Sequence, residues 1–314
     1  MSVVRFRPGL PSALIPRALL QQSPAVLVSS RSSSHMPGAT SGTLVCPRDD
    51  NGTGQPTWRN LQPVHGRARR CNHIFLPTEH DIMMSSLPDQ FHAIVIGASG
   101  TIGAAFVDLL SSSPRCASVH GLHRHSTPRI DFADQNSVAE AACVLATGGR
   151  YHLIINAAGM LHSETFMPEK RLADLNYLQM QETFQANTFG PALVMRHFVP
   201  LMASERAIMV MLSAKVGSIG DNRLGGWYSY RASKAALNMI VKTAAIEVAR
   251  NRKDSVLVAM HPGTVSSRLS QPFRGESIGR PAQAAAADML QVIDALTPAD
   301  SGAFRSYNGA ELPW

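Results

Sequence analysis

The chain has 314 residues, 45% of them hydrophobic, and a formal net charge of +7. This length suits one large α/β domain or two small ones, and no run comes near the roughly 20 apolar residues that a membrane span requires. Residues 91–314 hold 20 basic and 17 acidic residues without a basic stripe of interleaved aromatic side chains, so we expect neither a nucleic-acid nor a membrane partner.

The first ninety residues differ in composition from the rest. Residues 1–83 contain no lysine and no acid before Asp49, but many Arg, Ser, Pro and His. A mitochondrial or plastid transit peptide has this composition, and so does translated upstream sequence in front of a start at Met84. The segment has too little apolar surface to offset the entropy of ordering, so we predict a disordered leader over residues 1–90. The protein is then cytoplasmic if Met84 is the true start, and otherwise mitochondrial or plastid.

The first predicted element of the folded part is a strand over residues 91–96, which runs directly into a glycine-rich turn and a helix. The turn places Gly97, Gly100 and Gly103 three residues apart, and the following helix ends before Pro114. Glycines let the backbone approach a pyrophosphate, and a helix N-terminus offers unpaired N–H groups and a partial positive charge. The context predicts a dinucleotide-binding site.

A second predicted strand, residues 117–124, ends in a cation. An NAD site would place an acid there to accept from the ribose 2′-hydroxyl, whereas Arg124 suits a 2′-phosphate. We therefore expect NADP, with NAD possible if Arg124 is merely solvated. His120, His123 and His125 alternate between the faces of this strand and have no carboxylate or thiol partner, so no metal site is predicted.

Two further strands are predicted next along the chain. Residues 130–132 form the first, and Asp131 in it is placed to accept from an adenine amino group. Residues 153–155 are a continuous apolar run typical of a central parallel strand. The sequence Asn156-Ala157-Ala158-Gly159 follows, and small residues at a strand's carboxyl end leave room for a ligand that crosses the sheet edge.

A tyrosine and a lysine four residues apart, Tyr230 and Lys234, face the same way at the start of an apolar helix. A lysine ammonium close to a phenol stabilises the phenolate and lowers the tyrosine pKa. Such a tyrosine can exchange a proton with a carbonyl or alcohol oxygen.

With the glycine turn, the Asn156–Gly159 segment and the Tyr230–Lys234 pair in this order, residues 91–314 resemble the short-chain dehydrogenase/reductase family. The stretches 213–219 and 221–228 and the ending Glu311-Leu-Pro-Trp314 are similar to its C-factor-like and sniffer-type carbonyl reductase branch. The resemblance implies a single domain of Rossmann-like, doubly wound α/β fold, with a mostly parallel seven-stranded sheet and helices on both faces.

The family also implies a catalytic tetrad of Asn, Ser, Tyr and Lys. It carries over to Asn187, which holds a water in a proton relay, and to Tyr230 and Lys234. The serine departs from the family pattern, in which it stands three residues before a glycine, because that position is Ala214 here. We assign the role of polarising the substrate carbonyl to Ser213, with Ser218 as the alternative.

The resemblance further places the turn at Pro262–Val265 against the nicotinamide carboxamide, and residues 266–278 read as a mobile loop over the substrate. The expected substrate lining is Met160, Leu161, His162, Trp227 and this loop. The predicted cofactor-binding residues are Gly97, Ser99, Gly100, Thr101, Ile102, Gly103, Arg124, Asp131, Phe132, Asn156, Ala157, Ala158, Gly159, Tyr230, Lys234, Pro262, Gly263 and Val265.

We therefore expect an NADP(H)-dependent oxidoreductase that transfers a hydride between nicotinamide and a small carbonyl or alcohol substrate. Family members commonly form homodimers or homotetramers, and we expect the same here. Two alternatives stay open. One is an NAD(P)-binding signalling protein with little turnover, because Ala214 stands where a serine is expected. The other is a nucleotide-sugar epimerase or dehydratase, because the glycine spacing is that of the family's extended branch, although only 80 residues follow Lys234.

Overall fold

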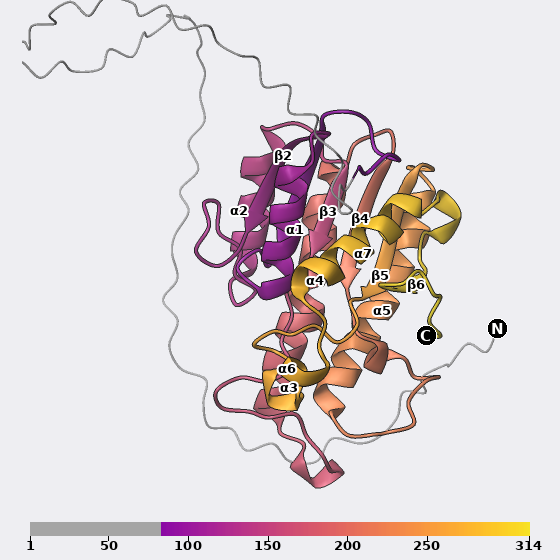
Figure 1. Cartoon of the computed structure of the whole chain (residues 1–314). Coiled ribbons are helices and arrows are strands. Elements are labelled where there is room, and N and C mark those ends of the chain that lie inside the picture. Colours follow the sequence, from indigo (N-terminus) through magenta and orange to yellow (C-terminus); the bar gives the residue numbers. More distant parts are fainter. Residues whose placement is uncertain (1–82) are drawn as a thin grey trace, which may run out of the picture. The chain divides into compact units, whose positions relative to one another are not determined.

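The computed structural model of the protein describes residues 83–314, apart from the side chain of Glu276 (Figure 1). Residues 1–82 of the predicted leader, and the targeting role assigned to it, lie outside these residues. The part that the structure describes contains a sheet of six strands: β1 (Phe91–Ile96), β2 (Cys116–Leu122), β3 (Leu153–Asn156), β4 (Ala207–Leu212), β5 (Ser255–His261) and β6 (Phe304–Ser306).

All neighbouring strands in this sheet are parallel, and their order is β2-β1-β3-β4-β5-β6. Every residue of β3 and β4 is buried, since both faces of a parallel sheet are covered by helices. This explains why the central strands are continuous apolar runs rather than alternating ones. The chain order reverses direction between β1 and β3, the position at which ligands bind in doubly wound folds.

Helices cover both faces of the sheet (Figure 1). On one face, α1 (Thr101–Ser112) and α7 (Ala282–Ala295) pack over one apolar cluster, and on the other face α2 (Gln135–Ala146), α4 (Gly190–Phe198) and α5 (Tyr228–Ala249) pack over a second. This confirms the predicted doubly wound α/β class. Within residues 83–314, no helix combines the length and the apolarity that crossing a membrane requires.

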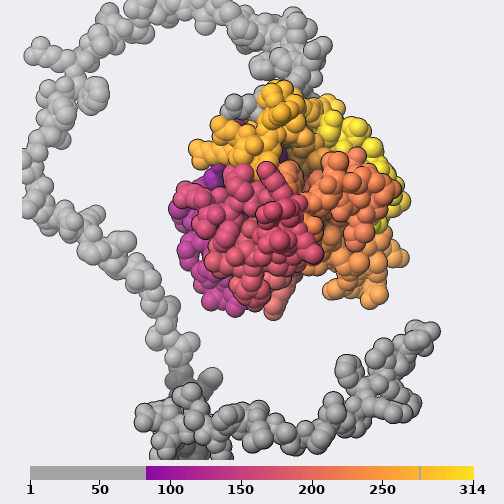
Figure 2. Space-filling view, turned by 90° about the horizontal axis from the view of Figure 1, so that it is seen from below, coloured from indigo at the N-terminus to yellow at the C-terminus, as the bar shows by residue number. Residues whose placement is uncertain are grey.

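Two short helices, α3 (Tyr177–Phe184) and α6 (Gly275–Ile278), lie beyond the carboxyl ends of the strands (Figure 1). A π-helical turn, Gln185–Phe189, joins α3 to α4, and a 3₁₀ turn, Lys215–Gly217, follows β4. Figure 2 looks onto this end of the sheet and shows the segments around α3, in pink, beside those around the start of α5 and the 266–278 loop, in orange. The long connections of the fold therefore gather at one edge.

The prediction of a strand over residues 130–132 is wrong, and it accounts for finding six strands where seven were expected. The Ile130 amide reaches the His123 carbonyl at 3.0 Å, but the Asp131 amide donates to the Ser137 hydroxyl at 2.9 Å, at the start of α2. The segment is thus bound to the first turn of a helix instead of extending the sheet. Ile130 is still buried, which is why its sequence resembles a strand.

The predicted boundary at residue 91 is too late. Met84 and Leu87 are 1% and 2% exposed and belong to the core under α1 and α7. The backbone amides of Ser85 and Ser86 donate to the Asp294 carboxylate at 2.8 and 2.7 Å, which fastens the segment to α7. Two apolar side chains and two amide donors are enough to order these few residues against the domain.

Candidate active site

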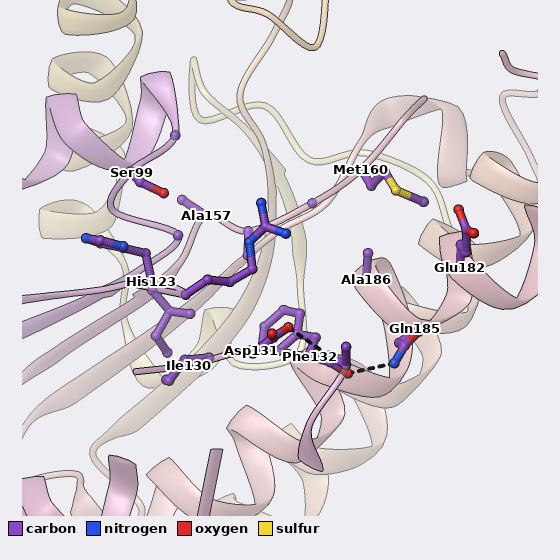
Figure 3. Close-up of a pocket in the computed structure, with 17 residues that line it drawn as sticks. Ser99, His123, Ile130, Asp131, Phe132, Ala157, Met160, Glu182, Gln185 and Ala186 are labelled. Carbon is purple, nitrogen blue, oxygen red and sulfur yellow. Dashed lines mark hydrogen bonds between the residues drawn. The ribbon is translucent and has the colours of Figure 1, made fainter. Parts of the chain in front are cut away.

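The carboxyl ends of β1 and β3 open into a cavity of about 480 Å³ (Figure 3). Parallel strands bring their carboxyl ends to one edge, so the segments that follow the strands meet there. Of the predicted cofactor-binding residues, nine line the cavity: Gly97, Ser99, Gly100, Arg124, Asp131, Phe132, Ala157, Ala158 and Gly159. His123, Met160, Glu182 and Gln185 line it as well.

The glycine turn needs its glycines because its backbone folds against neighbouring backbone. Gly97 has a φ of +82°, and a Cβ atom on it would lie 2.6 Å from the Ala158 nitrogen. A Cβ atom on Gly103 would lie 2.2 Å from the Gly97 oxygen. Gly100 caps α1 without a side-chain hydrogen bond, so the first turn, which contains Thr101 and Ile102, presents its N–H groups without a competing side chain. This is the geometry that an anionic phosphate group requires.

Arg124 and two acids, Asp131 and Glu182, also line the cavity. Arg124 is exposed at the end of β2, and no ion pair joins it to another of the described residues. Asp131 accepts from the Ala133 amide at 3.0 Å, and the Gln185 amide donates to the Phe132 carbonyl at 3.0 Å (Figure 3). The loop that replaces the predicted strand is therefore held in shape by its own hydrogen bonds.

Gly159 connects this cavity to the predicted proton-transfer residues. A Cβ atom on Gly159 would lie 3.3 Å from Asn187 Oδ1 and 3.4 Å from Lys234 Nζ. Upstream, Asn156 is fully buried, and its Nδ2 has no hydrogen-bond partner among the described residues. A buried amide donor without a partner is unfavourable in an isolated protein and fits a polar group of a bound molecule.

Asn187 lies in the π-helical turn between α3 and α4, a local distortion that is common at functional sites. Its Oδ1 accepts from the Met160 amide at 2.8 Å, and its Nδ2 donates to the Met160 carbonyl at 2.7 Å and to Ser233 Oγ at 3.1 Å. The side chain thus holds the segment after β3 against α5. The structure brings Asn187 next to Lys234, as the tetrad requires.

Tyr230 and Lys234 are both buried on the first turns of α5. Lys234 Nζ donates to the Leu212 carbonyl at 2.9 Å, and burial lowers the pKa of Lys234 to about 8. Burial raises the pKa of Tyr230, which is the opposite of the direction expected from a neighbouring ammonium. Burial removes water from around the phenol, so the phenol keeps its proton and can donate it.

Replacing Lys234 by Met should raise the free energy of unfolding near pH 7 by about 1–3 kcal/mol, because it removes a buried ammonium. The pKa of Lys234 is about 8 in the folded protein and 10.5 as the reference value. Between these two pH values the unfolded chain therefore binds more protons than the folded chain. Wild-type stability should therefore rise through this window and the variant's should not. Urea unfolding at about pH 7 and about pH 9.5 measures both. A variant that is less stable than the wild type at both pH values would contradict this account.

The hydroxyl of Ser213, the predicted catalytic serine, bonds a residue other than Tyr230. Ser213 Oγ donates to Asn238 Oδ1 on α5 at 2.6 Å, and Ser218 Oγ reaches the Trp314 carbonyl at 3.3 Å. The residue that shares an apolar cluster with Tyr230 and Leu161 is Ala214. Ala214, three residues before Gly217, is thus the residue beside Tyr230, and its side chain has no hydroxyl.

Replacing Ala214 by Ser should therefore raise kcat for carbonyl reduction by about tenfold or more, since one hydrogen bond to a developing oxyanion is worth at least this much. Ser213→Ala is the matched control and should change kcat by no more than about threefold, because the hydroxyl bonds a helix side chain. Steady-state kinetics on both variants measures the difference. A loss of activity in Ser213→Ala with no gain in Ala214→Ser would restore Ser213 as the polarising group.

The turn after β5 lies at the same edge of the sheet but does not line the cavity. Gly263 has a φ of +76°, and a Cβ atom on it would meet the Tyr307 ring at 2.8 Å, while Val265 is buried. Pro262 precedes this turn directly. Pro262, Gly263 and Val265 therefore stay predicted nicotinamide contacts outside the cavity itself.

The expected substrate lining is partly assembled. Leu161 and Trp227 pack around Tyr230 together with Val216, Leu269 and Phe273, the last two from the predicted loop. His162 lies edge-on to Phe273, at 6.0 Å between ring centroids, whereas Met160 lines the cofactor cavity. Sequence reasoning did not single out Phe273 or the buried Glu169, because nothing in a polar loop or in Pro168-Glu169-Lys170 marks a side chain as buried. Within residues 83–314, no three His, Cys, Asp or Glu side chains group as metal ligands would.

Comparison with known proteins agrees with this arrangement. A family model described as Enoyl-(Acyl carrier protein) reductase matches residues 106–303. The chain is 34% identical over 189 residues to 1-hydroxy-2-glutathionyl-2-methyl-3-butene dehydrogenase of Rhodococcus sp. (strain AD45), covering 60% of this chain and 79% of that protein. It is 36% identical over 144 residues to the C-signal of Myxococcus xanthus, covering 46% of this chain and 83% of that protein.

Two solved structures share the fold over nearly three quarters of the chain. The carbonyl reductase Sniffer of D. melanogaster superposes with a TM-score of 0.63 at 21% identity, over 72% of this chain and 100% of that one. The NADPH-bound carbonyl reductase from chicken fatty liver superposes with a TM-score of 0.62 at 25% identity, over 73% of this chain and 100% of that one. The chain belongs to the short-chain dehydrogenase/reductase family of oxidoreductases.

Proposed function

We propose that the protein reduces a small carbonyl compound with NADPH, with Tyr230 as the proton donor. The observation that carries this proposal is the position of Gly159, which lines the cofactor cavity and lies beside both Asn187 and Lys234. A dinucleotide held by the cavity residues would have Asn187 and Lys234 as neighbours at Gly159. The relatives described as carbonyl reductases support a carbonyl as the reacting group.

The residues around the cavity fit NADPH. The N–H groups at the start of α1 suit the pyrophosphate, and Arg124, which has no ion pair among residues 83–314, suits the 2′-phosphate. Asn156, next to the lining residue Ala157, has a buried amide donor without a partner in the same part of the chain. Related structures with bound NADPH or NADP give independent support. NADPH, when bound, supplies the hydride.

The chain's own residues supply the proton and the orientation. Tyr230 is buried and keeps its proton, so it donates to the carbonyl oxygen as negative charge develops there. Lys234, on the next turn of α5, places a positive charge near the phenolate that results. Asn187 fixes the segment at Met160 and faces Lys234, the direction from which a proton can be returned.

A cofactor titration tests the proposal on the purified chain. NADPH should bind with a dissociation constant in the micromolar range, and Arg124→Ala should weaken it by about tenfold or more while changing NADH binding by less than about threefold. Exposed Arg129, which is paired with Asp134, offers a matched control as Arg129→Ala. If neither cofactor binds, the proposed function is refuted; if Arg124→Ala weakens both equally, NADP specificity is refuted.

A further inference from the structure

Glu169 is a buried carboxylate that the proposed mechanism does not use. It is 2% exposed, and no ion pair joins it to a cation in the described part of the chain. Its carboxylate accepts from the backbone amide of Ser229 at 3.2 Å and from the Ser229 hydroxyl. These donors belong to the first turn of α5, where the partial positive charge of a helix N-terminus stabilises a carboxylate. The charge is compensated by the helix that carries Tyr230.

The backbone of Glu169 holds the turn that precedes this helix. Its carbonyl accepts from the Trp227 amide at 2.5 Å. Gly225, Gly226 and Trp227 have φ values of +63°, +64° and +53°, so three left-handed residues follow one another. The left-handed conformation costs a residue with a side chain about 1–2 kcal/mol, and contacts must offset this cost. The contacts from Glu169 supply such an offset on one side of the turn.

Arg231 holds the same turn from the other side. Its guanidinium donates to the Gly226 carbonyl at 2.9 Å and to the Val216 carbonyl at 3.2 Å. The turn is therefore held on one side by the Glu169 backbone carbonyl and by the helix start that the Glu169 carboxylate binds. On the other side it is held by the Arg231 guanidinium, which bonds backbone carbonyls. This is more restraint than a glycine-rich connection on the surface needs.

The consequence of this restraint is the position of the Trp227 ring. The ring lies edge-on to Tyr230, with centroids 6.2 Å apart, and to Phe273, with centroids 5.0 Å apart. Trp227 thus forms the wall between the predicted proton donor and the 266–278 loop. A carbonyl compound at Tyr230 would have this ring as a neighbour.

We propose that Glu169 is a positioning residue that fixes Trp227, and that Trp227 decides which carbonyl substituents fit at Tyr230. This inference rests on the proposed function. Glu169 itself is not catalytic, because its carboxylate bonds Ser229 and touches no group that takes part in proton transfer. A flat apolar substituent gains contact with a fixed Trp227 ring, whereas a small aliphatic substituent gains little. Comparing the two classes of substrate therefore distinguishes a role in positioning Trp227 from a role in the proton transfer itself.

Kinetics with benzaldehyde and propanal tests the proposal. Glu169→Ala and Trp227→Leu should each lower kcat/KM for benzaldehyde by about tenfold or more, mainly through KM, and for propanal by less than about threefold. The double variant should be no worse than Trp227→Leu alone, because both changes remove one and the same wall. Glu169→Gln keeps the shape and should give a smaller effect. The control is Glu164→Gln, an exposed carboxylate nearby, which should behave as wild type.

The proposal is overturned if Glu169→Ala affects both aldehydes equally, or if its effect adds to that of Trp227→Leu. A second readout does not depend on turnover. In chains labelled with 5-fluorotryptophan, the ¹⁹F resonance of Trp227, assigned with Trp227→Phe, should shift or broaden in Glu169→Gln and Glu169→Ala and not in Glu164→Gln. An unchanged resonance refutes the positioning role. A wild type that reduces neither these aldehydes nor a set of ketones, but shows the shift, refutes the proposed function and leaves the positioning role standing.

Discussion

Replacing Tyr230 by Phe should lower kcat for carbonyl reduction by about 10²–10⁴-fold, the usual contribution of a general acid, while NADPH still binds. The reason is the buried environment of the phenol, which raises its pKa and keeps the proton on the oxygen until a carbonyl accepts it. Phenylalanine preserves the apolar contacts with Leu161 and Ala214 and removes only the donor. Steady-state kinetics and a fluorescence titration with NADPH, run on the same preparation, measure both quantities.

Tyr228 provides the matched control for this variant, since it lies on the same turn of α5 outside the apolar cluster around Tyr230. Tyr228→Phe should keep kcat within about threefold of the wild type. An unaltered kcat in Tyr230→Phe would show that another group donates the proton. A loss of NADPH binding in that variant would show instead that the phenol belongs to the cofactor site.

Replacing Gly97 by Ala should weaken NADPH binding by about 100-fold or more and lower the free energy of unfolding by about 1–3 kcal/mol. The added Cβ atom would lie 2.6 Å from the Ala158 nitrogen. Gly97 and Ala158 meet here through their backbones, which cannot rotate out of the way as a side chain can. The segments after β1 and β3 must then move apart, and they form the floor of the cavity. Calorimetry and chemical unfolding measure the two effects.

Gly149→Ala is a control that distinguishes the steric clash expected in Gly97→Ala from the strain of placing a side chain at a positive φ. Gly149 has a φ of +113°, also outside the usual range for side chains, but a Cβ atom on it would meet nothing within 4 Å. This variant should lose some stability and keep its affinity for NADPH. Equal losses of affinity in the two variants would mean that strain, rather than the close approach at Gly97, controls the cofactor site.

Much of the fold was predictable because its signals are local. The strand, glycine turn and helix at residues 91–112 and the uniformly apolar central strands follow from periodicity and turn chemistry alone. The strand expected at residues 130–132 failed because the choice between a sheet edge and a helix cap depends on the Ser137 hydroxyl, which periodicity does not register. The burial of Met84 and Leu87 was not predicted, because the segment that carries them is too short to show a periodic pattern.

The sequence could indicate which residues belong to the site, but not how deeply each is buried or which partner it bonds. Spacing singled out Tyr230 and Lys234, and the family resemblance added Asn187. The structure has the first two on α5 and the third in the π-helical turn. The direction of the Tyr230 pKa shift depends on burial by Trp227 and by Leu269 and Phe273, and the last two come from a loop distant in the sequence. The orientation of Ser213 toward Asn238 depends on the strand register, and no residue count specifies it.

The central claim is hydride transfer to a carbonyl at Tyr230, and isotope transfer tests it most directly. The purified chain is incubated with benzaldehyde and with NADPH that carries deuterium at one or the other face of the transferable position, and the alcohol is analysed by mass spectrometry. We expect one deuterium in the product from one of the two labelled forms, and none from Tyr230→Phe in the same time. Tight NADPH binding with no deuterium in the product from either form, over benzaldehyde, propanal and a set of ketones, would contradict the claim and leave a nucleotide-binding protein without turnover.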